Sequence, residues 1–357
     1  MINRLYTKTT LLAVVLILLV TGCSTGWDIS NPYAEVDWVN DSRFKANFHT
    51  HTTNSDGRMN PQTVVDTYHQ LGYDILAITD HNEVTYPWTN FTAIEPSTTS
   101  LNRMESAPEA MPEDLIYENR DPAALGMIDI QSNELSRHHH MGSFFNDHNG
   151  TTTEEESLQA TAAKNGITML YHPGRYQQRN PEIYNLQWYL DAYGNYDHLF
   201  GLEVYNQGDR YPNDRRMWDS ILTVMMPDRP VWGYSNDDMH SLNQLGRNWT
   251  ELILPELTHE SVRHGMVNGL SFFVYAPEGH DGPSPPVIES ITVNERRGRI
   301  DINATGYESI VWISGGRVLH EGGSVNLAGL GEDLSYIRAK LYGPGETVTG
   351  TQPFGIR

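Results

Sequence analysis

The sequence predicts an α/β barrel followed by a small all-β domain. From residue 44 onward, short apolar runs alternate with helix-like stretches, which is typical of strands joined by helical crossovers. Residues able to bind metals repeatedly follow the apolar runs, as in α/β barrels, where active groups gather at the carboxyl ends of the strands. After residue 283, strand-like runs alternate with Gly-rich turns, which indicates a small sandwich.

The N-terminus has the pattern of a bacterial lipoprotein signal. A basic start and the apolar run 11–20 precede Cys23, the sole cysteine, in a small-residue cleavage pattern. The apolar run is shorter than the about 20 residues that span a bilayer. We therefore expect residues 1–22 to be a signal peptide, Cys23 to be lipidated and residues 23–43 to be a tether; an uncleaved anchor helix is the alternative. Ser24 after the cysteine resembles the outer-membrane sorting signal, which predicts a lipid-anchored protein of the cell envelope, periplasmic or at the surface.

Residues 44–283 carry the strands and helices expected of the barrel. A helix is predicted over 61–71, with Pro61 in its first turn and Gly72 after its end, and another over 153–164. The predicted strands, each followed by a polar segment, are 44–48, 74–79, 127–131, 167–171, 202–205 and 231–234.

Two segments interrupt or end this pattern. Residues 84–121 form a Pro-, Ser- and Thr-rich insertion, which we expect to be a lid or a covering loop. Residues 282–286 are a linker, because successive prolines stiffen the chain. The strands of the β domain, residues 284–357, are predicted over 287–293, 299–303, 309–314, 317–320 and 336–342. We expect its one tryptophan, Trp312, to lie in the core, and we assign this domain no activity.

The composition limits the partners and the ligands. The chain has 357 residues, 24 Lys and Arg and 45 Asp and Glu, which gives a net charge of −21. Such a chain repels a polyanion, so long nucleic acid is not expected as a partner, whereas small substrates and cations are compatible with it. With a single cysteine, no internal disulfide or Cys-rich zinc site is available, so a metal site must use His, Asp and Glu.

The first two polar clusters follow the first two predicted strands. His49 and His51 are two residues apart at a strand end, so both imidazoles point to the same side and are able to bind one cation. Asp56 lies on the turn that follows. His81 ends the next strand, and Asp80 beside it is placed to orient a neighbouring ligand.

Three further clusters lie at later strand ends. Glu134 precedes the histidine triplet 138–140, and its two carboxylate oxygens allow it to bridge two metals. The other two clusters are residues 172–176 and residues 236–240. A single histidine is usually a surface or core residue, but five strand ends carrying His, Asp or Glu are hard to explain by composition alone.

These clusters resemble the four motifs of the polymerase and histidinol phosphatase (PHP) superfamily. His-Thr-His at 49–51 with Ser-Asp-Gly at 55–57, Thr-Asp-His at 79–81, His-Pro-Gly at 172–174 and Asp-Met-His at 238–240 follow the order of the family, within residues 44–283. The resemblance implies a distorted, TIM-like (β/α)7 barrel. It also implies two or three bound metal ions, often zinc, manganese or iron, and the hydrolysis of phosphoesters.

The resemblance further implies which residues bind metal. The ligands are, for the first metal, His49, His51, Glu134 and Asp238; for the second, Glu134 as a bridge with His140 and His172; and for the third, Asp56, His81 and His240. His139 is the alternative to His140, and the adjacent acids leave Asp237 open beside Asp238. The long insertion at 84–121 departs from the commonest pattern of the family and leaves the substrate open.

The predicted mechanism is attack by a metal-bound hydroxide. Two metals about 3.5 to 4 Å apart lower the pKa of a shared water towards about 7 and neutralise the charge on the phosphoryl oxygens. Arg175 suits a phosphoryl oxygen or the leaving group, because its planar guanidinium matches phosphate geometry; a rim residue paired with a surface acid is the alternative. Arg175 and Asp80 are the residues we assign to catalysis beside the metal ligands.

The leading functional prediction is a lipid-anchored metallo-phosphoesterase for small phosphorylated compounds such as sugar phosphates. An exonuclease for short oligonucleotides is the second hypothesis, and the net charge argues against it. The third is a non-catalytic binding lipoprotein whose metals only stabilise the barrel. The complete ligand set argues against that hypothesis.

Overall fold

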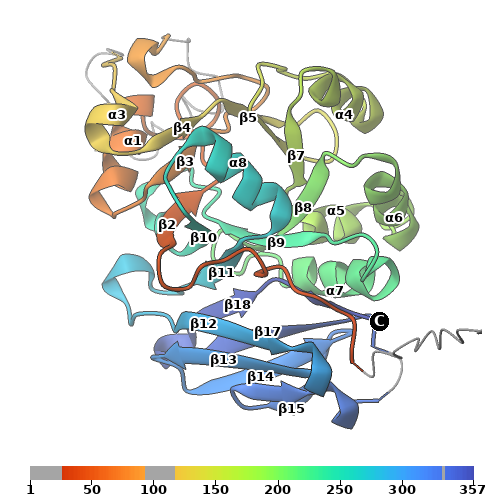
Figure 1. Ribbon diagram of the computed structural model, residues 1–357. Coiled ribbons are helices and arrows are strands. Elements are labelled where there is room, and N and C mark those ends of the chain that lie inside the picture. The colour runs from red at the N-terminus through yellow and green to blue at the C-terminus, as the bar shows by residue number, and fades with distance from the viewer. Residues whose placement is uncertain (1–25, 93–116, 332–333) are drawn as a thin grey trace, which may run out of the picture.

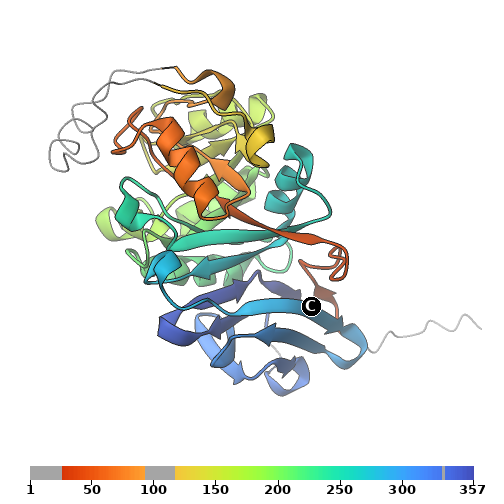
Figure 2. The ribbon, with the colours of Figure 1, turned by 90° about the vertical axis from the view of Figure 1, so that its left-hand side faces the viewer.

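The computed structural model describes residues 26–92, 117–331 and 334–357. The predicted signal peptide, Cys23 and most of the insertion at 84–121 lie outside these residues. The described chain forms an α/β part, and a β-rich part lies below it in both views (Figure 1, Figure 2). This confirms the mixed architecture that the sequence predicts.

The α/β part is built on two sheets. The first contains the parallel strands β2 (Ser42–Asn47), β3 (Ile75–Ala77) and β4 (Ile128–Ile130), and β2 pairs antiparallel with β10 (Asn248–Leu254), which pairs antiparallel with β11 (Ser271–Tyr275). The second contains, in chain order, β5 (Ser132–Leu135), β6 (Met141–Phe144), β7 (Ile167–Leu170), β8 (Leu199–Asn206) and β9 (Trp232–Asn236). Side chains of both sheets share one buried apolar core, which includes Ala46, Phe48, Phe144, Met169 and Tyr234.

The two sheets do not form one continuous hydrogen-bonded barrel among the described residues. Two isolated bridges, Thr50 with Met239 and His81 with Glu134, link the strand ends of one sheet to those of the other. Strand β6 is antiparallel to both β5 and β7, so the parallel order expected of the barrel is broken there. The bridges bring the ends of β2, β3, β5 and β9 together, where the polar clusters lie.

Helices cover the outside of the two sheets (Figure 1). Helix α1 begins as the sequence predicts, because Asn60 caps it by accepting from the Thr63 N–H and Pro61 occupies its first turn. The Thr153 side chain caps α4 in the same way. The helices are α1 (Pro61–Gln70), α3 (Pro122–Leu125), α4 (Glu154–Ala163), α5 (Pro173–Arg179), α6 (Leu186–Asn195), α7 (Asn213–Met225) and α8 (His259–Asn268).

The β-rich part is a sandwich that shares a sheet with the α/β part. One of its layers is β12 (Val287–Asn294), β13 (Arg299–Thr305) and β16 (Ser324–Asn326); the other is β14 (Ser309–Ser314), β15 (Arg317–Glu321), β17 (Tyr336–Tyr342), β18 (Val348–Thr351), β19 (Phe354–Ile356) and β1 (Ile29–Ser30). Strand β18 pairs with β11, so this second layer continues into the first sheet of the α/β part. Trp312 is buried between the layers, in the core where the sequence places it.

The part of the predicted tether that the structure describes, residues 26–43, packs along this sandwich (Figure 1). Strand β1 pairs with β19, and the Tyr33 hydroxyl donates to the Ser271 carbonyl at 3.0 Å. Ile29 and Tyr33 are buried in the same core as Phe272 and Trp312. This packing differs from an extended tether because the segment carries apolar side chains that gain from burial.

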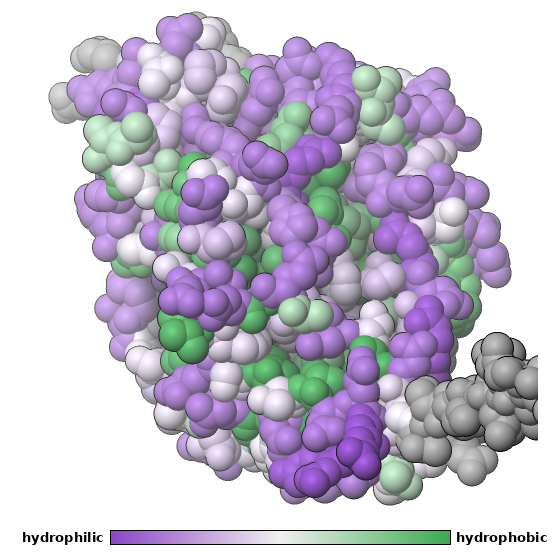
Figure 3. Space-filling view, in the orientation of Figure 1, coloured by the Kyte–Doolittle hydropathy of each residue, from purple (hydrophilic) through white to green (hydrophobic). Residues whose placement is uncertain are grey.

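The face seen in Figure 3 is mostly hydrophilic, with hydrophobic residues visible in small groups between hydrophilic ones. Within the described ranges, no helix combines the length and the apolar character needed to cross a membrane.

Candidate metal centre

The strand ends gather the predicted metal ligands at a cavity of about 260 Å³, which all of them line except His49 and His51, and these two are buried. His49 and His51 follow β2, His81 follows β3, and Glu134 lies within β5. Asp56 also follows β2. The other ligands come, like Glu134, from the second sheet: His140 precedes β6, His172 follows β7, and Asp238 and His240 follow β9. Residues separated by nearly two hundred positions therefore face one another.

Glu134 lies at the middle of the cluster. Its Oε1 is 2.7 Å from His140 Nδ1, 3.4 Å from His49 Nε2 and 3.6 Å from His172 Nε2. Its Oε2 is 2.8 Å from His81 Nδ1 and 3.4 Å from His51 Nε2. One carboxylate thus faces five imidazoles, which is the arrangement a bridging ligand requires.

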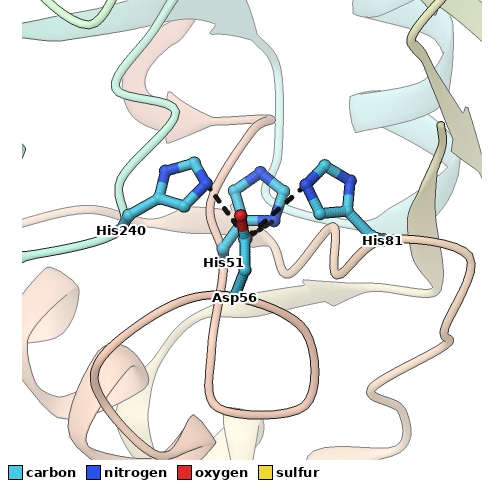
Figure 4. Close-up of side chains that lie close together, drawn as sticks. All are labelled: His51, Asp56, His81 and His240. Carbon is cyan, nitrogen blue, oxygen red and sulfur yellow. Dashed lines mark ion pairs between the residues drawn. The ribbon is translucent and has the colours of Figure 1, made fainter. Parts of the chain in front are cut away.

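Two further carboxylates complete the cluster. Asp238 Oδ1 lies 3.3 Å from His49 Nε2 and 3.2 Å from His51 Nε2. Asp56 Oδ1 lies 3.0 Å from His240 Nε2 and 3.5 Å from His81 Nε2, and the imidazoles of His51, His81 and His240 gather around it (Figure 4). Four groups of ligand atoms have the close spacing of a metal site: His51, Asp56, His81 and His240; His49, His51 and Asp238; His49, Glu134 and His172; and His81, Glu134 and His140.

These residues fit divalent metal ions. Many of their buried atoms have no hydrogen-bond partner within the part of the chain that the structure describes: His49 Nε2, His51 Nε2, His81 Nδ1, His140 Nδ1, His172 Nδ1 and both oxygens of Glu134. Buried polar atoms are costly unless something compensates them, so seven such atoms around one cavity indicate a missing ligand. Imidazole nitrogen and carboxylate oxygen are ligands of zinc and of other first-row metals.

The electrostatics divide the imidazoles of the site into two groups. Burial lowers the pKa of His51 to about 4 and that of His172 to about 3, so both imidazoles are neutral at pH 7. Burial alone would raise the pKa of Glu134, but the nearby His140, His81 and His49 hold it well below its usual value. Burial alone would lower the pKa values of His49, His81 and His240, but the carboxylates that face them raise these pKa values, that of His81 to about 10, so these three imidazoles release a proton when a metal binds.

Glu203 in β8 holds His49 and His172 from behind the cavity. Its Oε1 lies 2.8 Å from His49 Nδ1, and its Oε2 accepts from the His172 backbone N–H at 2.9 Å. The ring of Tyr171 stacks on His49 with the centroids 3.7 Å apart. The sequence analysis gave Glu203 no role at the site; the signal that the sequence offers is an acid within an apolar run.

Asp80 lies behind the ligands and is not among the described residues that line the cavity. Its carboxylate accepts from the Thr52 N–H at 2.7 Å and from the hydroxyls of Thr52, Ser55 and Thr85 at 2.6 Å each. These bonds shape the turn that carries His51 and Asp56. These contacts agree with the orienting role given to Asp80 from the sequence, and its assignment to catalysis stays a prediction.

The structure distinguishes His140 from its alternative His139, and Asp238 from its alternative Asp237. His139 packs against the rings of Tyr176 and Trp188, with centroids 4.1 and 5.2 Å away, whereas His140 faces Glu134. Asp237 turns away from the cavity and accepts backbone N–H bonds of 2.8 to 3.0 Å from residues 246–248. His140 and Asp238, the residues chosen from the sequence, are therefore the ones that lie within the cluster.

Arginines complete the wall of the cavity. Arg175, at the start of α5, lines it as the sequence predicts. Arg58 and Arg210 line it as well, together with Gln207 and Gln244, and sequence reasoning did not identify these four residues. Their participation depends on how loops distant in sequence pack together.

No protein-family model matches the sequence, and no curated protein matches it. Some solved structures resemble it. A two-domain protein from Bacteroides vulgatus that contains a predicted PHP-like metal-dependent phosphoesterase is 16% identical, with a TM-score of 0.49, over 90% of this chain and 88% of that one. PsfC from Pseudomonas syringae is 14% identical, with a TM-score of 0.40, over 63% and 88%. The lesion-specific endonuclease PfuEndoQ from Pyrococcus furiosus is 14% identical, with a TM-score of 0.40, over 63% and 56%. At these levels of similarity, the function must be argued from the site itself.

Proposed function

We propose that this chain is a metal-dependent phosphoesterase for small phosphorylated compounds. The observation that carries the proposal is the position of Glu134, whose two buried oxygens face five imidazoles at 2.7 to 3.6 Å. A carboxylate so placed is suited to bridge two cations, and paired cations are the usual catalysts of phosphoester hydrolysis.

Two or three divalent ions, zinc, manganese or iron, fit the ligand groups. His49, His51 and Asp238 would hold the first, His140 and His172 the second, with Glu134 between them, and Asp56, His81 and His240 the third. When bound, such ions lower the pKa of water and neutralise charge on the phosphoryl oxygens.

The chain itself would orient the ligands and the substrate. Glu203, 2.8 Å from His49 Nδ1, would hold a proton on that nitrogen and leave Nε2 to bind a metal. Arg175 would donate to a phosphoryl oxygen, since its Nε is buried and has no partner among the described residues. The cavity of about 260 Å³ suits a small compound better than a polymer.

The proposal also includes a distorted barrel as the fold and the cell envelope as the location of the protein. Two sheets around one core, linked by isolated bridges, support a distorted barrel. Lipidation of Cys23 after removal of residues 1–22 would hold the protein in the cell envelope, where it would meet small phosphate esters outside the cytoplasm.

The test is metal content by mass spectrometry, followed by phosphate release from p-nitrophenyl phosphate. We expect bound divalent metal, metal-dependent release in the wild type, and loss of release in His49→Ala with an unchanged circular dichroism spectrum. His264→Ala is the matched control, because His264 is exposed on α8 and pairs with Glu35. Full activity of His49→Ala would refute the proposal. Degradation of a 5′-labelled oligonucleotide instead would favour an exonuclease, and bound metal without any hydrolysis would favour a binding protein.

A further inference from the structure

Three arginines line the cavity without an acidic partner. Arg58, Arg175 and Arg210 come from three separate segments, and none of them forms an ion pair with any residue that the structure describes. Other described arginines also lack an ion pair, and what distinguishes these three is that they line one cavity beside the metal ligands. A guanidinium that is left without a carboxylate at a cavity wall is placed to bind an anion.

The metal ligands do not account for these arginines. The carboxylates on the described wall of the cavity are Asp56, Glu134 and Asp238, which together carry three negative charges. Two divalent ions would already exceed that charge, and a phosphate monoester dianion would then be attracted by the metals alone. Three additional positive charges therefore indicate that the bound molecule carries more negative charge than one phosphoryl group.

The arginines lie on two sides of the cluster. Arg175 follows His172 in the chain, at the start of α5. Arg58 is held beside His240, because its backbone N–H donates to the His240 carbonyl at 2.9 Å. Arg210 is held on the same side, since its guanidinium donates to Gln207, whose side-chain amide donates to the Asp238 carbonyl at 2.9 Å.

The remaining wall limits the rest of the ligand. The other polar residues are Gln207, Ser241 and Gln244, and no Phe, Tyr or Trp occurs among the described residues that line the cavity. A nucleobase therefore has no aromatic ring to stack on. The volume of about 260 Å³ lies below the usual range for drug-sized ligands, which indicates a compound of a few carbon atoms or a single sugar.

Building on the proposed function, we propose that the substrate is a small aliphatic or sugar phosphate ester that carries a second anionic group, and that Arg58 and Arg210 bind this second group. Arg175 then serves the phosphoryl group at the metal ligands. The second anion is a phosphate or a carboxylate, which a planar guanidinium binds in the same way.

Binding of phosphonates tests this inference separately from catalysis, because their C–P bond is not hydrolysed. The metal-loaded protein is titrated calorimetrically with 3-phosphonopropionate and with propylphosphonate, which differ by one carboxylate. We expect the first to bind about tenfold more tightly, the gain of one charge-assisted contact, and we expect R58Q and R210Q to remove most of this difference. R179Q is the matched control, because Arg179 is exposed at the end of α5.

Steady-state kinetics identify the second anion. Three phosphate esters with the same carbon chain are compared. Glycerol 3-phosphate carries no second anion, 3-phosphoglycerate carries a carboxylate, and 2,3-bisphosphoglycerate carries a carboxylate and a second phosphate. We expect KM to be about tenfold lower for the better of the last two than for glycerol 3-phosphate, with R58Q and R210Q raising that KM far more than the KM for glycerol 3-phosphate.

A failure of this inference and a failure of the proposed function give different results. One outcome is that p-nitrophenyl phosphate is hydrolysed, both phosphonates bind equally, and R58Q and R210Q leave both affinities unchanged. The proposed site for a second anion is then wrong, while the proposed phosphoesterase activity stands. If no ester is hydrolysed, the proposed function is wrong, and the phosphonate titrations still decide the anion site.

Discussion

Charged side chains are buried in two regions of this molecule, and they are compensated differently. At the strand ends of the α/β part, Glu134 faces five histidines, and one ring nitrogen of each has no hydrogen-bond partner among the described residues. Between α7 and the sandwich, Arg338 donates to both oxygens of Asp219 at 2.9 and 2.8 Å, and the Tyr336 hydroxyl donates to the same carboxylate at 2.7 Å. Glu134, Asp219 and Arg338 are all buried.

The difference shows how to distinguish a binding site from a structural contact. A buried pair with complementary geometry neutralises itself and fixes two elements relative to each other. A buried cluster with facing donors and acceptors that make no bonds requires something else to stabilise it. We therefore expect substitutions in the first region to affect chemistry and substitutions in the second to affect stability.

Glu134→Gln tests the chemical side of this contrast and should have the largest effect. The amide keeps the size of the side chain but removes the charge shared by five imidazoles. We expect phosphate release to fall at least about 1,000-fold, since losing a single transition-state donor already costs about 10²–10³-fold. Activity and metal content are measured together, with Glu35→Gln as an exposed control. Retention of both would show that Glu134 does not bridge the metals.

Asp219→Ala tests the structural side. It leaves the Arg338 guanidinium buried without its carboxylate, which should lower the free energy of unfolding by about 3 to 5 kcal/mol. Urea denaturation measures this change, and the folded fraction should keep its kcat. Asp228→Ala, which removes an exposed pair with Arg357, should change stability far less. A loss of kcat in folded Asp219→Ala would contradict the separation of the two regions.

Glu203→Gln sharpens the comparison, because Glu203 is buried and well bonded yet lies beside the metal ligands. Its contact with His49 Nδ1 should orient the imidazole and increase its basicity. We expect the affinity for metal, measured by competition with a chelator, to fall about 10- to 100-fold, with unfolding in urea changed little. An unchanged affinity together with a large loss of stability would place Glu203 with the structural contacts.

Lys340→Met should have the smallest effect and depends on pH. Burial, together with the nearby Arg215 and Arg338, lowers the pKa of Lys340 to about 7. The unfolded chain, with an ordinary lysine pKa of about 10.4, binds more protons than the native chain between these values, so stability should rise with pH across this window. Urea unfolding at pH 7, 8 and 9 should show a smaller rise in the variant than in the wild type or in the exposed control Lys164→Met. Equal slopes would contradict this assignment.

Local patterns predicted many of the elements. The helix predicted over 61–71 is α1 (Pro61–Gln70), and the strand predicted over 167–171 is β7 (Ile167–Leu170). The sequence did not predict β6 (Met141–Phe144), a short strand between two loops, or the pairing of β18 with β11. Such pairings depend on contacts between residues far apart in the chain, which no local periodicity encodes.

The candidate site was predictable to the extent that it depends on strand ends. His49 and His51 share a side because side chains alternate along a strand, and Asp56 and His81 lie where loops leave the sheet. Glu203, Arg58 and Arg210 were not predictable in this way, because their roles arise from three-dimensional packing. Binding of metal by these residues stays a prediction that mass spectrometry tests.

The pairing of β18 with β11 limits how the protein can be divided. An excised fragment ending near residue 283 would expose the backbone edge of β11, together with Phe272 and Phe273, to water. Unpaired apolar edges recruit other chains, so such a fragment should aggregate during expression. For this chain, the smallest soluble catalytic unit is therefore expected to include its C-terminal strands.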